Sequence, residues 1–147
     1  MFDVSTRQGW MGLLARAPSN RVSHLWANFG PVPAHETLRS PEIGAVMVRG
    51  RAGATGAPFN LGEMTVTRCT VSLACGTIGH GYVQGRNKAH AETAALIDAL
   101  MQTNRQSDLR KVILEPLAAE MEDARTTRAA KAAATKVEFF TLVRGED

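Results

Sequence analysis

The segment Gly81–Leu100, GYVQGRNKAHAETAALIDAL, holds the densest group of side chains that could do chemistry. Four charged or titratable residues follow Gly85 within seven positions: Arg86, Lys88, His90 and Glu92. Asn87 can cap a helix that begins here, and the unpaired amides of a helix start favour an anion. The two cationic side chains, with His90 as a third donor when it is protonated, would complete a site for a phosphate group.

A plain structural interpretation of the same residues stays open. Lys88 and Glu92 are four positions apart and can pair on the helix surface. His90 falls at the flank of the apolar face, where partly buried histidines are common. The residues alone therefore allow either an anion site or an ordinary charged helix start.

Metal and nucleophile chemistry find little support in the sequence. The tripeptide His90-Ala91-Glu92 matches half of the zinc deaminase signature, which also needs a later Pro-Cys-x-x-Cys. No cysteine follows Glu92, and Cys69 and Cys75 lie upstream with the wrong spacing. No nucleophile elbow is present. We expect neither a metal site nor a catalytic residue in this chain.

The sequence predicts that several strands precede the cationic helix start and would position it. Alternating apolar residues predict an antiparallel meander of about four strands over residues 35–84, with two of them joined near Pro41. A slip in the alternation near Arg68 indicates a bulge. The segment LRKVILEP could add one more short strand. Residues 87–104 form a helix whose apolar face would lie on the sheet.

Helices are also expected at both ends of the chain. Two N-terminal helices stop at Pro18 and at Gly30, and a long C-terminal helix begins at Pro116. After Met121, almost all apolar residues of this helix are alanines. The tail, residues 137–147, is apolar again and would dock either on this domain or on a partner. We expect one α+β domain over residues 1–147.

Composition limits the classes of partner. The chain has 147 residues, 44% hydrophobic residues and a net charge of +3, which is too weakly basic for a typical nucleic-acid binder. No apolar run is long enough to cross a membrane, and the first residues do not resemble a secretory leader. We expect a cytoplasmic protein without nucleic-acid or membrane partners.

Four stretches in order resemble one known family, the G subunits of the bacterial carbon–phosphorus lyase core complex. They are TRQGWMGLLA at residues 6–15, RAGATGAPFNLGEMTVTR at 51–68, GYVQGRNKAHAETAALIDALMQ at 81–102 and FFTLVRG at 139–145. The resemblance runs nearly end to end and is loose only at residues 20–39. Because Arg51 and Arg68 flank the second stretch, they are further candidates for ligand or partner contact.

The resemblance implies a role within an assembly that uses phosphonates. With its H, I and L partners, a G subunit supports the reaction of ATP with methylphosphonate, which gives α-D-ribose 1-methylphosphonate 5-triphosphate and releases adenine. The J subunit carries the iron–sulfur cluster for the later cleavage of the C–P bond, so no cofactor is expected on this chain. A chain made for such a heteromer can also form a homo-oligomer when isolated. A stand-alone nucleotide-binding or phosphate-binding protein or enzyme is the alternative.

Overall fold

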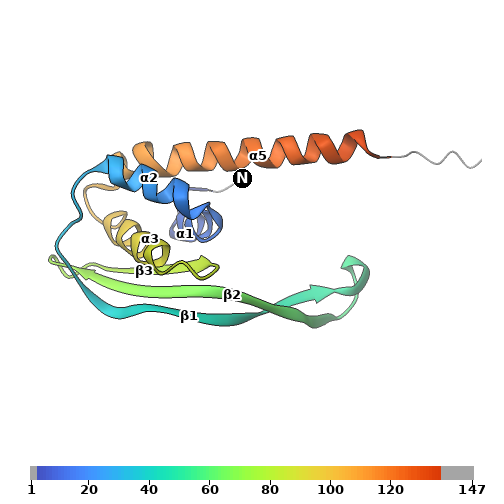
Figure 1. Cartoon of the computed structure of the whole chain (residues 1–147), viewed down its shortest axis with the longest axis horizontal. Helices are drawn as coiled ribbons and strands as arrows, with labels where there is room; N and C mark the ends of the chain where they lie inside the picture. The colour runs from blue at the N-terminus through green and yellow to red at the C-terminus, as the bar shows by residue number, and fades with distance from the viewer. Residues whose placement is uncertain (1–2, 137–147) are drawn as a thin grey trace, which may run out of the picture.

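The computed structural model describes residues 3–136, and the tail at residues 137–147 lies outside the described residues (Figure 1). The fold is α+β, as predicted. In chain order the elements are α1 (Arg7–Arg16), α2 (Ser19–Phe29), β1 (His35–Arg51), the 3₁₀ turn Ala52–Ala54, β2 (Pro58–Leu73), β3 (Ile78–Gln84), α3 (Lys88–Leu100), α4 (Gln106–Leu109), the π-helical segment Arg110–Leu114 and α5 (Glu115–Ala134). The two N-terminal helices, the central helix and the long C-terminal helix are therefore confirmed.

The sheet in the described part of the chain has three antiparallel strands in the order β1-β2-β3, where about four were expected. The difference arises at Pro41, which does not separate two strands. Ser40 and Pro41 together face the single residue Cys69, so β1 continues through a bulge. Proline is tolerated there because β1 is an edge strand, where a missing N–H breaks little of the ladder. The irregularity expected near Arg68 thus lies on the opposite strand.

The β1–β2 ribbon is much longer than the three-stranded part of the sheet. Strand β3 pairs only with residues 66–72 of β2. Residues 45–65 therefore form a two-stranded extension, which we call the hairpin arm. It runs from the body of the molecule, by which we mean residues 3–44 and 66–122, toward one end (Figure 1). No side chain in this arm is buried.

Helix α3 lies directly on the sheet at β3, as the sequence predicted. A Cβ atom added to Gly81 would come within 1.9 Å of the carbonyl oxygen of Ala91, and one on Gly79 within 2.0 Å of the carbonyl oxygen of Ala95. Both glycines therefore permit a backbone-to-backbone contact that no larger residue allows. The core continues over α1 and α2 through residues that include Leu13, Leu14, Val22 and Trp26.

The segment LRKVILEP is helical, so the additional strand proposed for it is wrong. Its buried residues are Leu109, Ile113, Leu114 and Leu117, which is the spacing of one helix face. Pro116 stands in the first turn of α5, directly after the π-helical segment. Proline lacks the N–H that a regular turn would use, and a local change in hydrogen-bond pattern accommodates that loss.

Only the first part of α5 packs on the body. Leu117 is its single buried residue, and every residue from 123 to 136 is exposed. We call residues 123–136 the helix arm; it extends past α1 and α2 in the same direction as the hairpin arm (Figure 1). Within residues 3–136, no helix combines the length and the apolar character that crossing a membrane requires.

Candidate functional site

The start of α3 is fixed by its contacts with β2. Gly85 takes a φ of +89°, which suits glycine, and its N–H donates to the carbonyl oxygen of Thr65 at 2.9 Å. The hydroxyl of Thr67 donates to the carbonyl oxygen of Gly85 at 2.7 Å. Asn87 caps the helix as predicted, since its Oδ1 accepts from the N–H of His90 at 3.0 Å. These bonds place the helix start at the root of the hairpin arm.

Two of the predicted cations at this helix start face solvent. Arg86 and Lys88 are exposed, and neither side chain forms a hydrogen bond or an ion pair with another residue of the described chain. Glu92 does not pair with Lys88, because its Oε1 lies 3.7 Å from Nε2 of His35 instead. The two cations and the capped helix start can therefore attract an anion without first breaking an internal ion pair.

His90 is separated from this cationic pair. Its side chain is 3% exposed, and its buried Nε2 has no hydrogen-bond partner within the described residues. Burial lowers the pKa of His90, and the nearby main chain of Leu14 only partly opposes this shift. A neutral, buried imidazole cannot act as the third donor of a surface anion site, so that part of the sequence hypothesis does not fit the geometry.

The remaining candidates lie on two other parts of the sheet. Arg51 stands at the tip of the hairpin arm, where its Nη1 donates to the carbonyl oxygen of Gly56 at 3.1 Å. Arg68 lies on β2, with its Nη2 2.9 Å from Oε1 of Glu42 on β1. The fold therefore brings only Gly85, Arg86, Lys88 and the main chain of α3 together.

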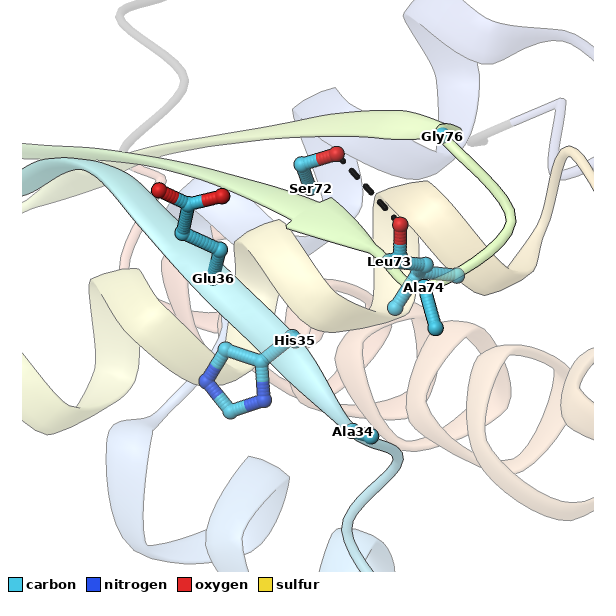
Figure 2. Close-up of a pocket in the computed structure, with 7 residues that line it drawn as sticks. All are labelled: Ala34, His35, Glu36, Ser72, Leu73, Ala74 and Gly76. Carbon is cyan, nitrogen blue, oxygen red and sulfur yellow. Dashed lines mark hydrogen bonds between the residues drawn. The ribbon is translucent and has the colours of Figure 1, made fainter.

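A separate hollow of about 450 Å³ lies at the end of the sheet formed by the β2–β3 turn and the start of β1 (Figure 2). Its polar side chains do not converge. His35 and Glu36 point to opposite sides of β1, and Ser72 donates to the carbonyl oxygen of Leu73 at 3.4 Å. Nδ1 of His35 lies 2.9 Å from the carbonyl oxygen of Pro33. With Ser72 and Nδ1 of His35 on nearby backbone and Glu36 on the other side of the strand, these side chains do not converge on one point of the hollow.

The sequence-based predictions did not include Asp98, a residue of α3 whose carboxylate accepts four hydrogen bonds. Its Oδ1 accepts from Nε of Arg7 at 3.1 Å and from Nε1 of Trp10 at 2.9 Å, and its Oδ2 accepts from Nη2 of Arg7 at 2.6 Å and from the N–H of His80 at 2.9 Å. The carboxylate is fully buried, and its hydrogen bond raises the pKa of Arg7. The signal was a charged residue inside the apolar run LIDAL, because buried carboxylates are rare unless they are paired.

The described residues offer a place where an anion can bind but no cluster of metal ligands. Within residues 3–136, no group of three or more His, Cys, Asp or Glu side chains is arranged to hold a metal ion. The exposed cations and main-chain amides at the start of α3 can bind a phosphate or a carboxylate.

Comparisons with known proteins agree on one family. The family model described as phosphonate metabolism protein PhnG matches residues 5–145. The chain is also 44% identical over 144 residues to the alpha-D-ribose 1-methylphosphonate 5-triphosphate synthase subunit PhnG of Rhizobium meliloti (strain 1021), an alignment that covers 98% of this chain and 92% of that protein. The chain therefore belongs to the PhnG family of phosphonate metabolism proteins.

Proposed function

We propose that this chain is a non-autonomous subunit of α-D-ribose 1-methylphosphonate 5-triphosphate synthase in the carbon–phosphorus lyase system. The observation that carries this proposal is the near-full-length relative, which is named as a subunit of that synthase. In this role the chain helps ATP and methylphosphonate react with release of adenine. It acts mainly as a scaffold and supplies no catalytic residue of its own.

The partners in this proposal are the H, I and J subunits of the core complex, with the L subunit associated functionally. ATP is the substrate of the complex, and the iron–sulfur cluster belongs to another subunit. The complex works in the cytoplasm. The exposed pair Arg86 and Lys88 supports a contact with either a triphosphate or an acidic partner, since both present negative charge to a helix start.

Reconstitution with and without this chain tests the proposal. The remaining subunits are incubated with ATP and methylphosphonate, and release of adenine is followed by chromatography. We expect activity only when the chain is added, and none from the chain alone. Full activity without the chain would contradict the proposal.

The alternative function is a stand-alone protein that binds a nucleotide or phosphate, and it rests on the same unpaired cations. Titration calorimetry of the isolated chain with ATP distinguishes the two. The subunit proposal predicts weak binding that does not lead to turnover. Tight binding that is lost in the Arg86→Ala, Lys88→Ala double variant would favour the alternative.

A further inference from the structure

We propose that the hairpin arm and the helix arm together form the docking surface for an acidic, partly apolar segment of a different subunit. This inference rests on the proposed function, because it names the surface through which the chain joins its complex. The two arms extend from the same end of the body, and α5 runs along the same direction as the β1–β2 ribbon (Figure 1).

The hairpin arm exposes large apolar side chains to solvent, where polar side chains would be expected. Met47 is 49% exposed, Phe59 is 45% exposed and Leu61 is 66% exposed. The arm has only two strands, and an isolated two-stranded hairpin is marginally stable in water. Exposed apolar residues on an unpaired ribbon are typical of a surface that a partner covers.

The helix arm has the same shortage of internal contacts. All residues from 123 to 136 are exposed, and the apolar ones are alanines. An isolated helix of this length is marginal, since most helices in proteins depend on packing of one face. Small alanine side chains allow another backbone to approach the helix closely.

The charge of this surface defines the partner. The two arms and the start of α3 carry eight cationic side chains against two carboxylates, whereas the rest of residues 3–136 carries eight cations against nine carboxylates. The eight cations are Arg49, Arg51, Arg86, Lys88, Arg125, Arg128, Lys131 and Lys136. Of these, Arg125 pairs with Glu122 at 2.5 Å. The basic character of the chain is therefore concentrated on the arms and between their roots.

This distribution favours a different protein over a second copy of the chain. Two identical arm surfaces would place cations against cations, which disfavours association. The acidic side chains of the partner segment would instead face the arm cations and the start of α3, while its apolar side chains cover Phe59 and Leu61, which lie on the same face of the ribbon as Gly50.

Matched variants in the co-expressed complex test the inference. Lys131→Glu on the helix arm is compared with Lys111→Glu, an exposed lysine of the body, and Leu61→Ser on the hairpin arm is compared with Ile78→Ser, which is exposed on β3. We expect each arm variant to weaken co-purification with the other synthase subunits by about tenfold or more, and the Lys131→Glu loss to change with salt. The body variants should behave like the wild type. Circular dichroism checks that every variant is folded.

Three results would overturn the inference. One is equal assembly of arm and body variants, and another is loss of assembly in the body variants alone. The third is a complex in which cross-linking joins the arms of two copies of this chain. The proposed function fails in a different way, namely when the remaining subunits keep full activity without the chain. Arm variants that assemble normally, in a complex that still needs the chain, would sink only this inference.

Discussion

In the body of the molecule α3 touches β3 backbone to backbone, and Asp98 ties two helices and a strand together with four hydrogen bonds. In the arms, no side chain among residues 45–65 or 123–136 is buried. The chain thus contains a body whose side chains are buried against one another and two arms whose side chains have no core to pack on. The difference indicates that the body maintains the fold, while the arms are shaped by what they meet in a complex.

We expect a large difference in stability between a body variant and an arm variant when a carboxylate is removed from each. Asp98→Ala leaves the buried indole N–H of Trp10 and the N–H of His80 without their acceptor, while the half-exposed Arg7 can turn to solvent, and we expect it to cost about 2–3 kcal/mol in the free energy of unfolding. Asp123→Ala, on the exposed helix arm, should change that free energy by less than about 0.5 kcal/mol. Urea unfolding followed by circular dichroism measures both. Equal losses would show that the arm belongs to the same cooperative unit.

Replacing a glycine by alanine in the body and in the hairpin arm tests how closely the backbone of each region is packed. Gly81→Ala forces a methyl group against the carbonyl oxygen of Ala91, and we expect a loss of about 3 kcal/mol, the upper end of overpacking costs. Gly62→Ala in the hairpin arm meets no atom within 4 Å and should not destabilise the chain. The same unfolding experiment serves for both. A tolerated Gly81→Ala would contradict the close contact between α3 and β3.

The buried His90 in the body should make the stability of the chain depend on pH. Burial holds the pKa of His90 below its ordinary value of 6.5, so the unfolded chain binds a proton more readily than the folded chain does. Protonation therefore favours unfolding, and stability should fall as the pH is lowered from 7 through 6.5 toward the folded-state pKa. His90→Gln should flatten this fall, and His24→Gln, at an exposed position of α2, should not. Unfolding curves at several pH values measure the slopes, and identical slopes for both variants would refute the assignment.

The smallest effect is expected in the helix arm. Ala129→Gly lowers helix propensity by about 1 kcal/mol at an exposed position, but the arm can unfold without the body. Global stability should change by less than about 0.5 kcal/mol, while amide exchange in residues 123–136 rises by about fivefold. Ala95→Gly, buried in α3 against β3, is the matched change in the body and should lower global stability. An equal global loss for both would mean that the arm unfolds with the body.

Local patterns were sufficient to predict much of the fold. The α+β class, the helical ends of the chain, the Asn87 cap and the contact of α3 with the sheet all follow from residue type and periodicity. Pro41 was misleading because its tolerance depends on β1 being an edge strand, which is a property of the whole sheet. The segment LRKVILEP was misleading because its short apolar run resembles a strand, and only the wider spacing from Leu109 to Leu117 identifies a helix.

The candidate site was predictable only in part. Arg86 and Lys88 stand exposed at a capped helix start, whereas His90 turns into the core because α1 covers its side of α3. Asp98 was missed because its partners Arg7 and Trp10 are about ninety positions away in sequence. The arms could not be foreseen as a pair, since no local pattern says that a hairpin and a helix will extend from the same end.

The central claim is that the arms are surfaces for a partner and the body is not. Hydrogen exchange followed by mass spectrometry, on the chain alone and on the assembled complex, tests it most directly. We expect residues 45–65 and 123–136 to exchange rapidly in the isolated chain and to become protected in the complex, while α3 and β3 are protected in both. Arms that exchange equally fast in both states would contradict the claim.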